Sequence, residues 1–423
     1  MDFELKPRTE AGMAFVTLAE QHAEEFAAHA EQFDRTNTFP KENITALQQS
    51  GYFAATVPRE LGGLGVESAY DYALGTSRLA RGDASTAIAA NMHLGGGFFL
   101  RRMWQAAQAR DDAPGAAPLE MALRAIANRQ LVLTGANSEP GADPVHPQTE
   151  ARRVPEGWAI NGFKIFGTGS PRATQIVSPV KVVEAEGQPT YWGIAQVPVG
   201  TPGMQIQNDW DALGMRASGS HSVVFKDCLV PPPLVNPLAP YGGWHEPYIA
   251  VMMIGNFGLV AGFLGIAEAA HALICETVKT KKKAPGKQTL GERPAIQRMI
   301  AENEIDLAAC RAMIERTGSA IDRLFESHHV MATPMEALHA VFKDFQCTKW
   351  LVNRKAVEVV DRAMTASGGA GYMSKNPLSR WYRDVRAGSF MQPLSPNEAF
   401  EYIGKVALGL DPTLDDWRPS DGG

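Results

Sequence analysis

The amino-acid sequence predicts an α+β protein of several domains, with helices at both ends and a β domain between them. Apolar residues recur at helical spacing up to about residue 130 and again from about residue 247. Between these stretches the pattern changes to short β-rich runs separated by turn residues. We therefore expect an N-terminal α-helical domain over 1–130, a middle antiparallel β-barrel or sandwich over 131–235, and a C-terminal four-helix bundle over 236–410.

The N-terminal domain is predicted from helical patterns in the first part of the chain. Residues 15–26 place apolar side chains at roughly helical spacing, and Asn43 begins a predicted capped helix that Gly51 ends. Residues 72–103 are rich in alanine and leucine, which favours a buried helix. Residues 106–118 form a polar, alanine-rich insert, which we expect to be exposed.

The middle domain is predicted from short runs of β-forming residues. These runs are residues 131–134, 158–161, 174–178, 191–197 and 222–225. Asn161 and Gly162 form a dipeptide that favours a two-residue turn, so we predict a tight hairpin there. Three consecutive prolines that begin at Pro231 mark the end of this domain.

Long amphipathic stretches predict the C-terminal bundle. Residues 293–324 and 337–366 repeat apolar side chains at three- and four-residue spacing. The most apolar stretch, residues 248–272, contains Asn256, Glu268 and several glycines, so we interpret it as a core helix rather than a membrane span. Residues 411–423 are polar and contain Pro and Gly, and we expect a flexible tail there.

The composition excludes some classes of function. A formal charge of -6 gives no reason to expect binding to nucleic acid. The cysteines at 228, 275, 310 and 347 include no Cys-x-x-Cys pair, so we expect neither a metal site nor a disulfide framework. The N-terminus lacks the apolar core of a signal peptide, so we expect a cytoplasmic protein without a membrane anchor.

Two adjoining motifs near the C-terminus carry a resemblance to a known family. Ser367-Gly-Gly-Ala-Gly-Tyr372 is followed by Arg380-Trp-Tyr-Arg-Asp-Val-Arg386. Together they resemble the C-terminal signature of the acyl-CoA dehydrogenases. The resemblance implies the helical, β, helical-bundle architecture, a flavin cofactor and a homo-oligomer, either a dimer or a tetramer. It also implies that Gly368 and Gly369 lie against the adenosine part of FAD, where any side chain would block the close approach.

Two further motifs are similar to segments with which this family binds the flavin ring. In Asn137-Ser-Glu-Pro-Gly-Ala-Asp143, the resemblance implies that Asn137 and Ser138 face the pyrimidine edge of the ring. In Lys164-Ile-Phe-Gly-Thr-Gly-Ser170, it implies that Phe166 packs on the ring and Thr168 bonds near its reactive nitrogen N5. Taken alone, the first motif could be an ordinary turn and the second a strand that enters a glycine turn.

The sequence does not decide between FAD and FMN as the flavin. An arginine of the family grips the flavin pyrophosphate, and Lys283 falls at its position here. A lysine supplies positive charge without the bidentate fork of an arginine. We therefore expect FAD, with FMN as the alternative.

The carboxylate that the family uses as its catalytic base is missing. A dehydrogenase of acyl thioesters needs such a group to remove the α-proton of its substrate. In the C-terminal segment its position falls among Met391, Gln392, Pro393 and Leu394, and none of these is acidic. The alternative position on the first bundle helix falls at Gly255. Glu398 follows nearby, and we expect it to be solvated or to cap a helix.

Three functions therefore remain open. The family resemblance implies dehydrogenation of an acyl-CoA or a similar thioester, with an electron-transfer flavoprotein as electron acceptor. The missing base favours instead a monooxygenase on the same fold that uses reduced flavin and O₂ and works with a flavin reductase. Some such enzymes carry a histidine in the helical domain, which makes His93 a candidate, although a structural histidine fits equally well. A non-catalytic flavoprotein subunit is the third possibility.

Overall fold

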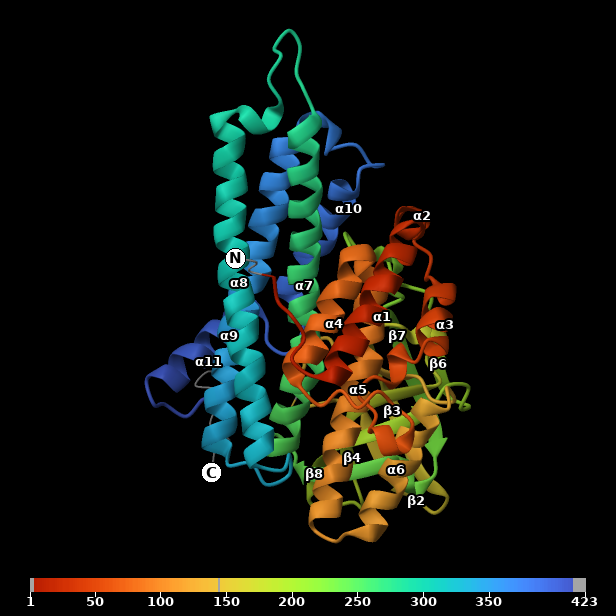
Figure 1. Cartoon of the computed structure of the whole chain (residues 1–423). Helices are drawn as coiled ribbons and strands as arrows, with labels where there is room; N and C mark the ends of the chain where they lie inside the picture. Colours follow the sequence, from red (N-terminus) through yellow and green to blue (C-terminus); the bar gives the residue numbers. More distant parts are fainter. Residues whose placement is uncertain (1–3, 144, 414–423) are drawn as a thin grey trace.

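The computed structural model describes residues 4–143 and 145–413, so the predicted tail at 411–423 lies outside the described residues from 414 onward. Helices form both ends of the described chain, and one eight-stranded sheet lies between them in sequence (Figure 1). The predicted fold class is confirmed. The long bundle helices stand beside a compact body, in which N-terminal helices cover the sheet (Figure 1).

The N-terminal part differs from the prediction in how its helices are divided. Its helices are α1 Glu10–Ala27, α2 Ala30–Thr36, α3 Lys41–Gln49, α4 Ala69–Gly82, α5 Ala84–Ala109 and α6 Ala113–Ala127. The expected single helix over 72–103 is interrupted at Asp83, whose carboxylate accepts a hydrogen bond from Ser85 N at 3.1 Å and caps α5. The expected insert over 106–118 is the end of α5 and the start of α6.

The predicted capping role of Asn43 is wrong. Helix α3 begins two residues earlier, and Asn43 lies inside it with its amide donating to Thr86 Oγ1 at 3.0 Å. The side chain is buried, so the asparagine joins α3 to α5 instead of capping the start of a helix.

The sheet is mixed rather than purely antiparallel. Its strands are β1 Leu133–Gly135, β2 Glu150–Val154, β3 Gly157–Gly167, β4 Gln175–Val183, β5 Thr190–Pro198, β6 Met204–Ile206, β7 His221–Val230 and β8 Val235–Pro240. The order is β6-β7-β3-β2-β4-β5-β8, and β1 also pairs with β4. Strand β4 runs parallel to β1 and β2, and the other pairs are antiparallel. Strand β3 runs antiparallel to β2 on one edge, and β4 then runs in the direction of β2 on the other edge.

The hairpin predicted at Asn161 and Gly162 is wrong as well. Both residues lie inside β3, where the pairing with β7 shifts register. A Cβ on Gly162 would lie 2.3 Å from Thr149 Oγ1, so close packing explains this glycine.

The C-terminal part is built on three long helices. Its helices are α7 Glu246–Thr280, α8 Pro294–Ser327, α9 Met335–Ser367, α10 Pro377–Asp384 and α11 Pro396–Ala407. Helix α11 packs on α9 as a shorter fourth member, with the Phe342 and Tyr402 rings 5.2 Å apart. Among the described residues α7 alone is long and apolar enough to cross a membrane, and 89% of its most apolar window is buried inside the protein. It is the central core helix of the bundle.

The Arg380–Arg386 run joins the three parts of the structure. Arg383 donates to Asp34 Oδ1 of α2 at 2.9 Å, and Asp384 accepts from Met215 N at 2.6 Å. Met215 belongs to the loop between β6 and β7. This motif therefore holds the bundle against both the N-terminal helices and the sheet.

Candidate functional site

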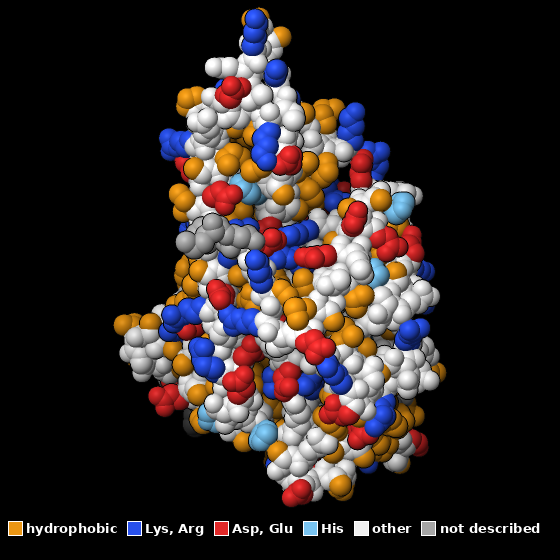
Figure 2. Space-filling view, in the orientation of Figure 1, with side chains coloured by type: hydrophobic (Ala, Val, Ile, Leu, Met, Phe, Trp, Pro, Cys, Tyr) orange, Lys and Arg blue, Asp and Glu red, His pale blue; other side chains and the backbone are white. Residues whose placement is uncertain are grey.

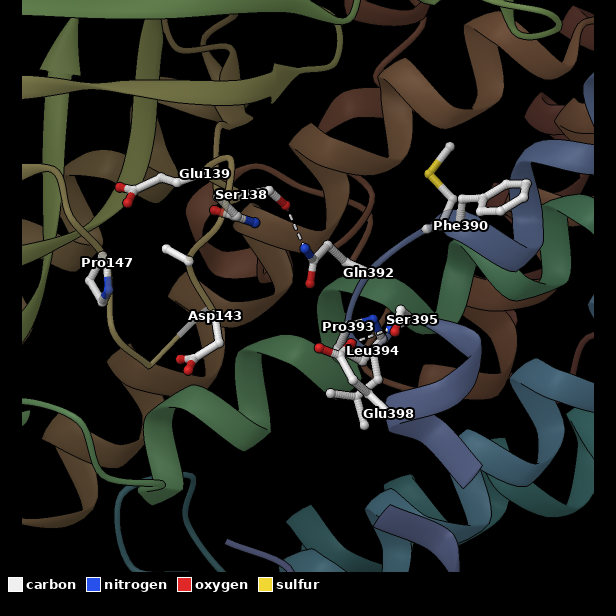
Figure 3. Close-up of a pocket in the computed structure, with 13 residues that line it drawn as sticks. Ser138, Glu139, Asp143, Pro147, Phe390, Gln392, Pro393, Leu394, Ser395 and Glu398 are labelled. Carbon is white, nitrogen blue, oxygen red and sulfur yellow. Dashed lines mark hydrogen bonds between the residues drawn. The ribbon is translucent and has the colours of Figure 1, made fainter. Parts of the chain in front are cut away.

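A pocket with a volume of ≈ 160 Å³ opens between the sheet and the bundle. One wall is the loop after β1, and the other is the segment that leads into α11 (Figure 3). The residues that line it are Asn137, Ser138, Glu139, Ala142, Asp143, Pro147, Phe390, Met391, Gln392, Pro393, Leu394, Ser395 and Glu398. One wall contains the predicted flavin motif that begins at Asn137, and the other contains the segment Met391 to Leu394, where the family places its base.

The two predicted flavin motifs are bonded to each other. Ile165 N donates to Ser138 O at 2.8 Å, and the buried Lys164 ammonium lies 2.5 Å from Glu139 Oε1. Burial lowers the pKa of Lys164 to about 8, and the charge of Lys164 lowers the pKa of Glu139 against the opposing effect of its own burial. The loop of Ser138 is thus held against the end of β3, which carries Phe166 and Thr168.

Hydroxyl groups and an exposed aromatic ring meet at this end of β3. Thr168 Oγ1 lies 2.9 Å from Ser220 Oγ, which lies 2.6 Å from Ser218 Oγ. Phe166 is 50% exposed, with the Trp210 ring 5.3 Å away and nearly perpendicular to it. A half-exposed ring beside a row of hydroxyl groups suits a planar heterocycle with polar edges.

The opposite wall presents Gln392 to Ser138. Gln392 Nε2 donates to Ser138 Oγ at 2.5 Å (Figure 3). Lys349 of α9 fixes this segment by donating to the carbonyls of Met391 and Leu394 at 2.5 and 2.6 Å. Asn353, one turn later, donates to Gly388 O at 2.8 Å. Two polar side chains of the bundle therefore set the path of the segment on both sides of Gln392.

No carboxylate stands at either position where the family places its base. The segment Met391 to Leu394 offers Gln392 as its one polar side chain, and Gly255 leaves open space where a side chain would begin. Glu398 accepts from Ser395 N at 2.7 Å in a capping box at the start of α11, as expected.

His93 is buried on α5 with both ring nitrogens engaged. Nδ1 accepts from Leu133 N at 3.0 Å, and Nε2 donates to Phe53 O at 3.1 Å. Burial lowers the pKa of His93 to about 4, so the ring is neutral at pH 7. These contacts favour the structural interpretation of this histidine, and His93 does not line the pocket.

Lys283, Gly368 and Gly369 lie at the far end of the bundle. The hairpin after α7 meets the end of α9 there, where Lys281 Nζ donates to Ser367 O at 3.1 Å. Figure 2 shows Lys and Arg side chains at the tip of this hairpin. From Lys349 to Gly368 the helix rises about 28 Å, at about 1.5 Å per residue. Within a single chain, these three residues therefore lie far from Ser138.

The sequence prediction did not assign roles to several residues that shape the pocket. Lys349 and Asn353 belong to the buried stripe of α9 together with Phe345 and Val352. A lysine in a helix stripe whose other buried members are uncharged is a signal that could have identified them. Lys164 and Glu139 belong to the two motifs that resemble flavin-binding segments, but their ion pair forms only in the folded chain.

Comparison with known families now identifies the chain. Models of the acyl-CoA dehydrogenase N-terminal, middle and C-terminal domains match residues 9–114, 132–228 and 257–395. The chain belongs to the acyl-CoA dehydrogenase superfamily. Flavin is the cofactor of this superfamily, and the donors and the exposed ring around Ser138, Phe166 and Thr168 fit it. The chain is a flavin-dependent oxidoreductase, as the resemblance implied.

Several individual relatives are nitrososynthases. The amino sugar nitrososynthase DnmZ of Streptomyces peucetius is 32% identical over 96% of this chain and 95% of its own length. A nitrososynthase structure from Micromonospora carbonacea var. africana is 32% identical, with a TM-score of 0.86 over 97% of this chain and 100% of that chain. KijD3, solved with FMN and dTDP-3-amino-2,3,6-trideoxy-4-keto-3-methyl-D-glucose, is 31% identical, with a TM-score of 0.86 over 96% and 95%.

Proposed function

We propose that this protein is a monooxygenase that uses reduced flavin and O₂ to oxidise the amino group of a nucleotide-linked amino sugar. The observation that carries the proposal is the pocket segment Met391 to Leu394, which offers Gln392 as its polar side chain and no carboxylate where a thioester dehydrogenase needs one. The nitrososynthase relatives support the monooxygenase branch over the expected dehydrogenase. The KijD3 complex supports an amino sugar on dTDP as the class of substrate.

The chemistry of a nitroso product requires two oxygenations of one nitrogen. In the first, amine, O₂ and reduced flavin give hydroxylamine, water and oxidised flavin. In the second, hydroxylamine, O₂ and reduced flavin give the nitroso group, two waters and oxidised flavin. Neither reaction removes a proton from carbon, so neither needs the carboxylate with which a dehydrogenase removes an α-proton. The bound flavin supplies the electrons, and the protein orients the amine and excludes bulk water.

We propose FMN as the flavin, held by Ser138, Phe166 and Thr168. FMN ends at its phosphate and needs no contact with the distant loop of Gly368 and Gly369. KijD3 is solved with FMN, which supports this choice. Reduced FMN has to be delivered by a partner, so we expect a flavin reductase rather than an electron-transfer flavoprotein. We also propose that the protein is a homo-oligomer, as the resemblance implied.

A paired experiment tests the function. Purified protein is mixed with FMN, NADH, a flavin reductase, air and dTDP-3-amino-2,3,6-trideoxy-4-keto-3-methyl-D-glucose, and products are followed by mass spectrometry. We expect hydroxylamine and nitroso products, with an oxygen from ¹⁸O₂ incorporated. In the second arm, oxidised protein is mixed without oxygen with a panel of acyl-CoA thioesters. Bleaching of the flavin by any of them would contradict the proposal.

A further inference from the structure

The amide oxygen of Gln392 is a buried acceptor without a donor. The amide nitrogen is used by Ser138 Oγ, so the oxygen is directed away from that bond. Among residues 4–143 and 145–413, no group donates a hydrogen bond to Gln392 Oε1. Burying an acceptor without a partner is unfavourable, so an unpartnered acceptor in a pocket suits a donor supplied by a ligand.

The charged groups around this acceptor are engaged with other partners. Glu139 lies 2.5 Å from Lys164, and Asp143 lies 2.9 Å from His146. On the bundle side, the carboxylate of Glu398 accepts from a backbone amide, and the ammonium of Lys349 donates to two carbonyls. Tyr248 of α7 faces the same region, and burial raises the pKa of its phenol well above the usual range. The oxygen of Gln392 is thus an uncharged acceptor at this point that has no donor among the described residues.

A neutral acceptor suits the oxidation of an amine. The nitrogen needs its lone pair to receive oxygen, so only the unprotonated amine reacts. A carboxylate beside the amine would favour the ammonium form and raise the amine pKa by about 1–3 units. An amide oxygen can accept an N–H from the amine and orient it without that electrostatic penalty.

We propose that Gln392 binds the substrate amine through Oε1 and keeps it unprotonated. This inference rests on the proposed function. It also explains why the dehydrogenase base is absent, since a carboxylate at this position would suppress N-oxygenation. Gln392 is then the residue of the pocket that selects a neutral amine.

Two variants of equal length separate charge from hydrogen bonding. Gln392→Glu adds the charge and can still accept a hydrogen bond from Ser138, whereas Gln392→Met removes the acceptor and stays neutral. With FMN, a reductase and the dTDP amino sugar named above, we expect Gln392→Glu to lower kcat/KM at pH 7.5 about tenfold and to move the pH profile upward by about one unit. Gln392→Met should raise KM without moving the profile.

Ligand binding provides a readout that does not depend on turnover. By calorimetry at pH 6.5 without reductant, Gln392→Glu should bind the amino sugar about five- to tenfold more tightly than wild type, and dTDP-glucose, which has no amine, with unchanged affinity. A merely structural disturbance would weaken both ligands. Failure of wild-type protein to oxidise the amine contradicts the proposed function. Oxidation by wild type with an unmoved profile and unchanged affinity in Gln392→Glu overturns the inference about Gln392 alone.

Discussion

His93 is held by backbone groups of two segments that are far apart in the sequence. Its ring lies 4.4 Å from the Phe53 ring, and its nitrogens pair with Phe53 O and Leu133 N. Leu133 begins the first strand, so the histidine ties α5 both to the 3-10 turn at Phe53 and to the sheet. We propose that this structural role replaces the catalytic role considered from the sequence.

Replacing His93 with leucine should lower the stability of the protein but leave its catalytic rate nearly unchanged. The change leaves a buried N–H and a buried carbonyl unpaired, which costs about 2–4 kcal/mol. We expect a lower urea midpoint, while the folded, flavin-loaded variant keeps kcat within about threefold. His329→Leu, at an exposed histidine, is the control and should shift stability by less than about 0.5 kcal/mol. A loss of kcat above a hundredfold in folded His93→Leu would restore the catalytic role.

The low pKa of His93 predicts sensitivity to acid. The folded pKa of about 4 lies below the ordinary value of 6.5, so the unfolded chain binds a proton between these values that the folded chain does not. The stability from this group is complete above pH 6.5 and is lost as the pH falls through 4, by up to about 3 kcal/mol. Urea unfolding at pH 7 and pH 4.5 should therefore differ more for wild type than for His93→Leu.

At the scale of elements, α10 has a structural role that its sequence signature did not reveal. Asp384 is buried at the end of the helix, accepts from Met215 N, and lies 3.9 Å from Arg380 Nε. Burial raises the pKa of Asp384 to about 7. The motif that best identified the family therefore holds the domains together and does not line the pocket.

Two substitutions of Asp384 should differ in effect. Asp384→Ala leaves the buried Met215 N–H without an acceptor and should cost about 1–3 kcal/mol, whereas Asp384→Asn keeps an acceptor and should cost less than about 1 kcal/mol. Because the folded pKa is raised, the contribution of Asp384 to stability declines as the pH rises from about 4 to 7. Thermal unfolding across this range should show that decline in wild type and not in Asp384→Asn. Equal losses in both variants would contradict this account.

At the scale of the whole molecule, distance separates the two halves of the predicted cofactor site. The segment that lines the pocket is bonded to Lys349, and about 28 Å of helix α9 separates Lys349 from the glycine loop at Gly368. FAD would have to reach such a loop through a second copy of the chain, whereas FMN would not. A substitution in the glycine loop can therefore test whether the protein uses FAD or FMN.

Gly369→Leu tests which flavin is used. A Cβ at Gly369 meets no atom within 4 Å, so the substitution should be tolerated in the fold. If FMN is the cofactor, wild type should bind FMN at least as tightly as FAD, and Gly369→Leu should change the FMN affinity less than twofold, measured by quenching of flavin fluorescence on titration. Ser138→Ala is the comparison and should weaken FMN binding about fivefold, the equivalent of about 1 kcal/mol. A tenfold loss of FMN affinity in Gly369→Leu would contradict the FMN proposal.

Patterns within single segments were predicted well, and contacts between segments were not. The helical spacing of residues 15–26 and 337–366 and the β-rich runs appear in the structure as expected. Asn161-Gly162 was misread because a tight-turn dipeptide can also serve a close approach inside a strand. Asn43 was misread because its partner, Thr86, lies in another helix.

The fold class, the superfamily and the absence of the dehydrogenase base could all be predicted from the amino-acid sequence. These follow from periodicity, local motifs and residue identity, which are properties of short stretches of chain. Which residues form the pocket depended on how the chain folds. It set Gln392 against Ser138, placed Lys349 behind the segment that carries Gln392, and engaged both nitrogens of His93. These hydrogen bonds join segments 40 to 254 residues apart, so they depend on packing and cannot be predicted from local sequence patterns.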